Sequence, residues 1–378
     1  MNSLQRIPPA PREQVPVAAQ LAEDYTLKLK DILTDGLLSL HIHLGIELGL
    51  FTKLGDFECA GATSAELAAS LGLNERMTRE WLHAMVCGRL VSHRRGGEAD
   101  EVRYFLAEGQ KQVMTGTDCG PANILAAFTY LPRFYCLKDR LANTFRTGVG
   151  PCYDTYGRQV ACGIKSFFAP WFRQSLPSLI ESVDGLKDRL DKGAKVADVG
   201  CGAGEALCVM ASRYPNSTFD GYDTSQEALK VASETKALWG LKDHVAFKDA
   251  TVERLPLEPT YDLICTFDCV HDMTFPSEVI KAIRNALKPD GVWLISDLQG
   301  ASHAADNYTH PQGAMLYSFS VALCLQAAMS EEGGEALGTL GFHQAKAESM
   351  ARAAGFGHFE VLPFEHPLNS YYLVKINK

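Results

Sequence analysis

The sequence lacks any long hydrophobic run. None of its apolar stretches approaches the about 20 residues that a membrane-spanning helix needs, so no membrane partner is expected. The first residues, MNSLQRIPPAPREQVPVAAQ, contain several prolines and no continuous apolar stretch, which is untypical of a signal peptide. This composition predicts a disordered tail over residues 1–23.

Paired cysteine motifs are also missing. The eleven cysteines form no CxxC pair, and several of them lie inside apolar segments. Without a secretion signal, this favours reduced thiols in a cytoplasmic protein. His41 and His43 lie two positions apart in a helical pattern and so point to different sides, which makes them poor joint ligands. No metal site is predicted.

Positive charge is scarce. The chain has 36 Lys and Arg against 45 Asp and Glu, with a net charge of −9 and a pI near 5.7. This charge argues against a protein that functions mainly by binding nucleic-acid phosphates, and it is compatible with a small-molecule substrate.

The N-terminal part has the pattern of a winged helix. Residues 24–54 are too apolar for a solvated helix, so they are expected to pack against their own domain or a second subunit. Thr63 or Ser64 and then Asn74 can cap two helices, and two short strands separated by GGEAD follow. Residues 63–103 hold six arginines, six acidic residues and no lysine. We therefore expect a winged-helix domain over 24–115 that makes a homodimer and binds no nucleic acid.

Residues 116–185 read as a helical connector rich in aromatic side chains. Eleven aromatics lie between residues 128 and 172, where the chain-wide share of 9% would give about four. The excess fits either a core or an apolar ligand pocket, and both remain open. Tyr153, Tyr156 and Trp171 are the preferred pocket residues, because polar residues interrupt their neighbourhood.

From residue 194 onward, short apolar strands alternate with amphipathic helices. This alternation predicts an α/β fold with a parallel sheet covered on both faces. The last two strands, HFEVLPFE and SYYLVKIN, are separated by a short turn and are expected to form an antiparallel edge.

A glycine-rich loop follows the first strand of this series. VADVGCGAGEA places Gly200, Gly202 and Gly204 at the start of a helix, and Asp223 ends the second strand nineteen residues later. The loop is not the GxGxxG of dinucleotide-binding proteins, and Glu205 at the helix start would repel a pyrophosphate. With Asp198 close by, the charges suit a cationic nucleoside such as S-adenosylmethionine.

The motif D-x-G-x-G-x-G-E, the acid at Asp223 and the Asp249-Ala250 pair resemble the class I S-adenosylmethionine-dependent methyltransferases. With the winged helix, the architecture is similar to small-molecule O-methyltransferases that have an N-terminal dimerisation domain. The resemblance implies a Rossmann-like sheet of seven strands in a catalytic domain over 186–378. It implies a cofactor site made by Asp198, Gly200, Cys201, Gly202, Gly204, Asp223, Thr224, Asp249, Ala250, Phe267 and Asp268.

The fourth strand ends in TFDCVHDM, where such sheets bind ligands. His271-Asp272 resembles the His-Asp pair of plant-type O-methyltransferases, whose histidine is the general base, and Asp297 falls where the family has a bracing carboxylate. The catalytic residues implied are therefore His271, Asp272 and Asp297. Three features depart from the family: Met273 replaces a usual Trp, Phe267 a basic residue, and a second bracing glutamate expected near Gly341 is absent.

Residues 300–340 form a long insertion before the last helix. A connection of this length within a compact fold is usually functional. It contains an apolar helix from about Gly313 to Met329, flanked by glycines, which suits a lid over the substrate. Met315 and Tyr317 are candidate pocket walls.

Three functions stay open. The combination of HDM, lid helix and C-terminal strands resembles bacterial winged-helix methyltransferases that act on small molecules, and neighbouring groups methylate sulfur, as in dimethylsulfoniopropionate synthesis. A thiol or thioether acceptor needs no base, and His271 would then only shape the pocket. A third alternative is a protein that binds S-adenosylmethionine without methylating and acts through its winged helix. The sequence does not identify the acceptor.

Overall fold

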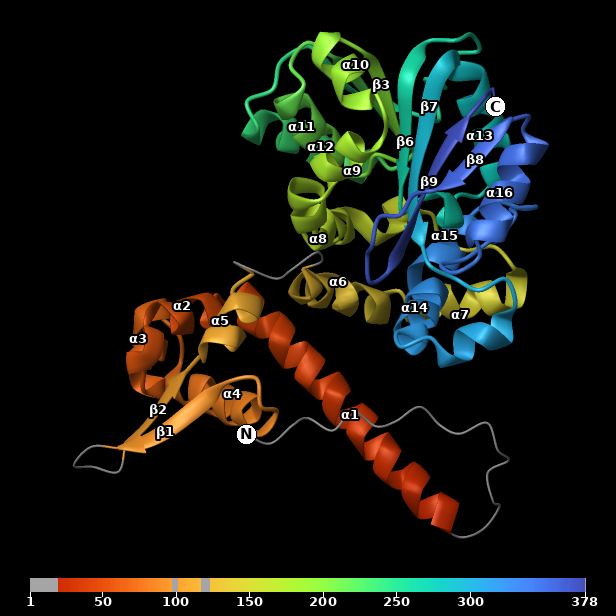
Figure 1. Ribbon diagram of the computed structural model, residues 1–378. Coiled ribbons are helices and arrows are strands. Elements are labelled where there is room, and N and C mark those ends of the chain that lie inside the picture. Colours follow the sequence, from red (N-terminus) through yellow and green to blue (C-terminus); the bar gives the residue numbers. More distant parts are fainter. Residues whose placement is uncertain (1–19, 97–100, 117–122, 378) are drawn as a thin grey trace. The chain divides into compact units, whose positions relative to one another are not determined.

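The computed structural model describes residues 20–96, 101–116 and 123–377 (Figure 1). The chain divides into two compact units, residues 1–117 and 118–378. Of the tail expected over 1–23, residues 1–19 lie outside the described part, and residues 20–23 belong to the first helix. The aromatic-rich connector expected over 116–185 falls almost wholly in the second unit.

The first unit contains helices followed by a two-stranded wing and a last helix. Its elements are α1 Gln20–Glu47, α2 Leu50–Asp56, the 3-10 helix η1 Glu58–Ala60, α3 Ser64–Leu71, α4 Glu75–Cys87, β1 Ser92–Gly96, β2 Glu101–Phe105 and α5 Glu108–Met114. Thr63 caps α3 in a capping box with Glu66, and Asn74 caps α4. Strands β1 and β2 pair antiparallel. The predicted winged helix is confirmed.

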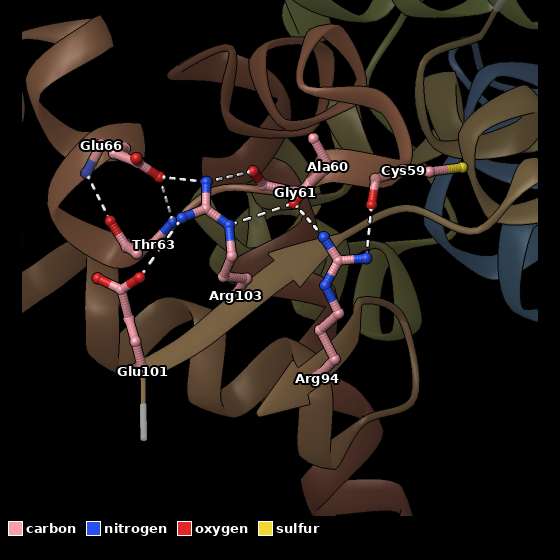
Figure 2. A network of polar contacts seen from close by, with 8 residues as sticks. All are labelled: Cys59, Ala60, Gly61, Thr63, Glu66, Arg94, Glu101 and Arg103. Carbon is pink, nitrogen blue, oxygen red and sulfur yellow. Dashed lines mark hydrogen bonds and ion pairs between the residues drawn. The ribbon is translucent and has the colours of Figure 1, made fainter. Parts of the chain in front are cut away.

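Two of the three arginines of the wing strands are bound to the protein itself. Arg94 donates to the carbonyl oxygens of Cys59 and Ala60, and Arg103 donates to those of Ala60 and Gly61 (Figure 2). Arg103 also lies 2.8 Å from the Glu66 carboxylate. Because these two guanidinium groups already have acceptors in the protein, they are less available to bind phosphate; Arg95 is exposed.

Helix α1 exposes a large apolar surface. Leu29 and Leu33 are each 65% exposed in the single chain. The same helix exposes Tyr25, Leu27, Ile32, Leu37 and Leu40. Exposed apolar side chains gathered on one helix are typical of an interaction site.

Among the described residues, no single helix is long and apolar enough to cross a membrane, although α1 and α2 together, bent by 64°, satisfy the length and composition criteria.

From residue 123, where its description starts, the second unit begins with five helices. They are α6 Ile124–Cys136, α7 Lys138–Thr147, α8 Tyr153–Gln174, α9 Leu176–Ser182 and α10 Leu186–Lys192. The helical path of α8 is broken at Gly157, whose φ of 75° is accessible to glycine at little cost.

The sheet and its helices follow. Its elements are β3 Lys195–Val199, α11 Glu205–Arg213, β4 Thr218–Asp223, α12 Gln226–Leu238, β5 Val245–Asp249, β6 Tyr261–Phe267, the 3-10 helix η2 Val270–Asp272, α13 Pro276–Ala286, β7 Leu287–Leu298, α16 Gln344–Ala353, β8 His358–Val361 and β9 Asn369–Lys375. The seven strands lie in the order β5-β4-β3-β6-β7-β9-β8. Strand β9 pairs antiparallel with β7 and β8, and the other pairs are parallel. The predicted α/β sheet with an antiparallel edge is confirmed.

Both faces of the sheet are packed against helices (Figure 1). Alternate residues of one strand serve opposite faces: Leu263 and Cys265 of β6 belong to one core cluster, and Ile264 belongs to the other. Cys265 and Cys269 are both buried, and they belong to the core clusters on opposite faces of the sheet. The strand order reverses at β3 and β6, which is where open α/β sheets bind ligands.

The insertion between β7 and α16 contains a helix with a wide turn. It consists of the 3-10 helix η3 Ala304–Thr309, α14 Gly313–Phe319, the π-helix η4 Ser320–Cys324 and α15 Leu325–Ala328. Two side chains stabilise the π segment by hydrogen bonds to its backbone. Tyr156 donates to the Ala322 carbonyl at 2.7 Å, and Gln326 donates to the Val321 carbonyl at 2.7 Å. π-Helices often lie at functional sites.

Candidate active site

A cavity of about 590 Å³ opens at the carboxyl ends of the parallel strands. Its walls come from α8, the glycine loop after β3, the end of β4 and the segment after β6. It is lined by ten of the eleven expected cofactor residues: Asp198, Gly200, Cys201, Gly202, Gly204, Asp223, Thr224, Ala250, Phe267 and Asp268.

The glycine loop has the backbone conformation that glycine accepts. Gly200, Gly202 and Gly204 have φ values of 77°, 51° and 75°. A Cβ on Gly204 would lie 2.4 Å from the Phe247 ring, and one on Gly200 would lie 2.7 Å from Cys269 Sγ. A Cβ on Gly202 would meet nothing within 4 Å. Packing therefore requires glycine at positions 200 and 204, whereas open space lies beside Gly202.

Asp223 organises the mouth of this loop. Its carboxylate accepts the Gly202 amide at 2.7 Å and the Ser225 amide at 2.8 Å. Burial raises the pKa of Asp223, and the two backbone hydrogen bonds oppose that rise. Both carboxylate oxygens are thus fixed in place, with lone pairs left for a ligand's hydroxyls.

Asp198 presents a buried oxygen without a partner. Its side chain is 2% exposed, and Oδ1 has no hydrogen bond from any described residue. Burial, together with the negative charge of Asp223, raises the pKa of Asp198 to about 8. A buried polar atom without a partner is costly, so a cationic or hydrogen-bond-donating ligand would relieve this one.

Glu205 is paired within the protein. Arg173 Nη2 lies 2.6 Å from its carboxylate. The positive charge of Arg173 compensates the repulsion that the sequence argument attributed to Glu205. The electrostatic argument against a pyrophosphate ligand therefore depends on Asp198 and Asp223.

Asp249 does not line the cavity. Its carboxylate accepts hydrogen bonds from the Thr251 amide at 2.9 Å, the Thr251 hydroxyl at 2.6 Å and Gln226 Nε2 at 2.6 Å. These hydrogen bonds lower its pKa. Asp249 shapes the turn after β5, and its neighbour Ala250 reaches the cavity instead.

The expected substrate residues divide between cavity and core. Tyr153 lines the cavity, whereas Tyr156 and Trp171 are buried in core clusters. Met315 and Tyr317 do not line it either, and Tyr317 is 37% exposed. Met273, noted in the sequence for its departure from the family, is a wall residue, and further wall residues that the sequence did not single out are Ile164, Phe168, Phe172, Arg254, Leu255 and Glu331. Phe168 and Phe172 were part of the aromatic excess, but their sequence neighbourhood did not separate them from core residues.

His271 and Asp297 form a buried pair. His271 Nδ1 lies 2.7 Å from Asp297 Oδ1, and the two residues are 3% and 0% exposed. Burial opposes the charged imidazolium, but the Asp297 carboxylate and the Cys324 side chain together raise the pKa of His271 well above its usual value. Neither residue lines the cavity; Asp272, the next residue, does.

Two further carboxylates surround this pair. Tyr153 donates its hydroxyl to Asp272 Oδ2 at 2.5 Å, and burial raises the pKa of Asp272 to about 6. Asn369 Nδ2 lies 2.7 Å from both oxygens of Asp268, and burial together with Asp297 raises the pKa of Asp268 to about 7. Asp268 has a φ of 51°, a left-handed conformation that non-glycine residues adopt mostly at constrained sites.

The comparison with known families identifies both units. Residues 190–355 match the family model described as a methyltransferase domain. This part of the chain is a methyltransferase domain. Residues 36–116 match the model of an Rv2258c-like winged HTH domain. The glycine loop, Asp223 and the His271–Asp297 pair all lie inside the methyltransferase domain.

Individual relatives are distant. The chain is 28% identical over 129 residues to a malonyl-[acyl-carrier protein] O-methyltransferase of Halalkalibacterium halodurans, covering 33% of this chain and 46% of the relative. The chain spans about half the length of the curated relatives that it matches first. These matches cover only part of each protein.

Solved structures share the fold over nearly the whole chain. Human N-acetylserotonin methyltransferase in complex with SAM has a TM-score of 0.67 at 18% identity and covers 94% of this chain and 98% of its own. A putative O-methyltransferase from Nostoc punctiforme has a TM-score of 0.65 at 18% identity and covers 96% and 99%. The methyltransferase domain and its N-terminal partner thus occur together in known structures.

Proposed function

We propose that this protein is an S-adenosylmethionine-dependent methyltransferase that O-methylates a small molecule, with His271 as general base. The match of residues 190–355 to a methyltransferase domain supports the activity. The observation that carries the choice of base is the 2.7 Å contact between His271 Nδ1 and Asp297 Oδ1 beside the cavity.

The cavity fits the cofactor by the chemistry of its donors and acceptors. Asp223 would hold the ribose hydroxyls, and the unpartnered Oδ1 of Asp198 suits the ammonium of the methionine moiety. Gly202 leaves space beside the loop backbone. Ala250 and Leu255 offer an apolar wall for the adenine. When bound, S-adenosylmethionine supplies an electrophilic methyl group on a sulfonium.

His271 would take the proton of the acceptor's hydroxyl. Asp297 accepts the Nδ1 hydrogen, which fixes the tautomer and leaves Nε2 as the basic atom. Asp297 would also stabilise the imidazolium formed by proton transfer. Because the pKa of His271 is raised, the free base is scarce at low pH, and the rate would rise with pH as Nε2 loses its proton.

Access to His271 depends on the insertion. The histidine is 3% exposed and lies off the cavity wall, whereas Ala327 of α15 is on the wall. The segment α14–η4–α15 would therefore have to shift to let an acceptor reach Nε2. This is the lid function expected for residues 300–340.

A base can be tested by removal. His271→Ala would lower turnover about 100-fold or more, in line with the contribution of a positioned base, while S-adenosylhomocysteine still binds by calorimetry. His303→Ala, in an exposed part of the insertion, is the matched control and would leave turnover unchanged. Near-normal turnover in His271→Ala would contradict the base, and no binding heat in the native protein would contradict the cofactor.

One observation favours a second candidate, S-methylation. His271 lies off the wall of the cavity, whereas Met273, Phe168 and Phe172 form it. A thiolate or thioether acceptor needs no proton removed, so a base off the wall would be no obstacle. Turnover of a thioether by His271→Ala at the native rate would support this candidate.

The first unit would form a homodimer through α1. The exposed leucines of α1 supply the apolar surface. Arg94 and Arg103 of the wing are already bonded to backbone carbonyls, which argues against nucleic acid as the partner. A gel-shift assay with random DNA tests the latter point, and a shift at physiological salt would contradict it.

A further inference from the structure

We propose that His271, Asp272 and Cys324 form a binding site for a soft divalent metal ion of the Zn²⁺ type, and that the bound ion withholds His271 from catalysis. The metal-binding claim goes beyond the proposed function and is independent of it. Only the inhibitory consequence depends on His271 being the base.

The three residues bring one ligand atom each to one place. Their ligand atoms all lie within 4.8 Å of one another, and His271 and Cys324 are 3% and 9% exposed. Tetrahedral Zn²⁺ with bonds of about 2.0–2.3 Å holds its ligands about 3.3–3.6 Å apart. Small side-chain adjustments would therefore close the site around an ion.

Both His271 and Asp272 have the outer partners that metal ligands usually have. Asp297 Oδ1 lies 2.7 Å from His271 Nδ1, which leaves Nε2 to bind a metal. Tyr153 donates to Asp272 Oδ2 at 2.5 Å, and the other oxygen, Oδ1, accepts no hydrogen bond from a described residue. Such hydrogen-bonded outer partners orient ligands and strengthen binding.

Cys324 is the last residue of the π segment, and that segment is braced. Tyr156 and Gln326 bind the carbonyls of Ala322 and Val321, and Ser320 Oγ accepts the Thr339 amide at 3.1 Å. These hydrogen bonds restrain the backbone that carries the Cys324 thiol. No motif of the sequence pairs it with His271, which lies 53 residues earlier.

The ligand set selects the class of ion. One thiolate, one imidazole and one carboxylate suit Zn²⁺, whereas Mg²⁺ and Ca²⁺ prefer oxygen ligands. A Cys324 thiolate and an Asp272 carboxylate balance the two positive charges of the ion. Binding forms the S–Zn bond as the thiol proton leaves to solvent, and no electron is transferred. A water molecule would complete the tetrahedron.

Occupation would be inhibitory. The lone pair of Nε2 would bind the ion and could no longer accept a proton from an acceptor. The ion would also tie the insertion, through Cys324, to the segment after β6. It would thus hold closed the element that has to move for substrate to reach His271.

Co²⁺ is a suitable probe, because a thiolate ligand gives it a charge-transfer absorption band. The chelator-treated full-length protein, without cofactor or acceptor, should bind one equivalent of Co²⁺ with this band. Cys324→Ser should abolish the band and weaken Co²⁺ binding at least tenfold. Cys136→Ser, at an exposed cysteine, is the matched control and should keep both. Asp297→Asn should keep the band but weaken binding about 10- to 100-fold.

The outcomes separate the claims. The site is overturned if the native protein shows no stoichiometric thiolate band, or if Cys324→Ser, with an unchanged melting temperature and unchanged S-adenosylhomocysteine binding, keeps it. Zn²⁺ should inhibit methyl transfer by the native protein and much less by Cys324→Ser, each compared with its own metal-free rate. Equal inhibition of both would overturn the regulatory role. A protein that shows no methyl transfer still gives a decisive Co²⁺ titration.

Discussion

The hydroxyl of Tyr153 lies 2.5 Å from Oδ2 of Asp272, joining the start of α8 to the short helix after β6. Both residues line the cavity, and they come from segments 119 positions apart. This hydrogen bond fixes a carboxylate next to His271 and connects the aromatic helix to the strand end where chemistry is expected.

Tyr153→Phe should therefore impair the site without unfolding it. Removing the hydroxyl leaves Asp272 without its hydrogen-bond donor, and hydrogen bonds to charged groups contribute about 1.5–3 kcal/mol. We expect turnover or cofactor affinity to fall about tenfold, with little change in melting temperature. Steady-state kinetics would distinguish a change in kcat from one in KM. Tyr135→Phe, at a tyrosine 76% exposed, is the control, and an equal loss there would refute the role.

Binding of S-adenosylmethionine should release a proton from Asp198. Burial and Asp223 raise the pKa of this carboxyl to about 8, so it is mostly protonated at neutral pH. A bound cation would favour the carboxylate and lower that pKa. The affinity for S-adenosylmethionine should therefore rise with pH and level off above the pKa of about 8. Calorimetry in two buffers of different ionisation heat measures the proton.

Asp198→Asn is the matched variant, because it removes the titrating group and keeps the shape. Its binding heat should not depend on the buffer, and its affinity should no longer follow that pH rise. Native protein that releases no proton at neutral pH would show that Asp198 is ionised before the ligand arrives.

Gly204→Ala should destabilise the methyltransferase domain strongly. The new Cβ would lie 2.4 Å from Phe247, and φ is 75°, so overpacking adds to backbone strain. Together these would cost about 2–4 kcal/mol of unfolding free energy. Gly240→Ala is the control: φ is 64° and nothing lies within 4 Å of the new Cβ, so this variant has the backbone strain without the overpacking. Chemical denaturation should show the smaller loss for Gly240→Ala; equal losses would mean that Phe247 moves aside freely.

The exposed leucines of α1 should control oligomeric state. Leu29→Asp with Leu33→Asp puts two charges into the proposed dimer surface, and burying unpaired charges is costly. We expect the dimer to become monomeric, as measured by light scattering after size exclusion. Lys30→Glu on the same helix changes charge without removing apolar area and should leave the dimer intact. A native protein that is monomeric at micromolar concentration would end this proposal.

Local pattern was enough to predict the cofactor loop. Gly200, Gly202, Gly204 and Asp223 lie where strand, turn and helix signals place them, because the loop is set by short-range backbone geometry. The position of Asp297 beside His271 came from family resemblance. Spacing alone would not have paired residues 26 positions apart on separate segments.

Tertiary packing decided the rest. Tyr153 and Tyr156 lie within one turn of each other, yet one lines the cavity and the other is buried in a core cluster. Tyr156 is held by its hydrogen bond to Ala322 of the insertion and by packing in that cluster, and composition does not encode these contacts. Likewise, Arg173 neutralises Glu205 from 32 residues away, which weakened a charge argument made from the loop alone.

The π segment makes chain length itself a determinant of this site. A π turn holds more residues than an α turn, so deleting one residue between Ser320 and Cys324 would let the helix run on as regular α-helix. Everything after the deletion would rotate by about 100° relative to what precedes it. Cys324 would then face another direction, although every side chain near His271 would be unchanged in identity. Relatives of this protein with one residue fewer here are expected to keep the methyltransferase fold while losing the cysteine from its place beside the histidine.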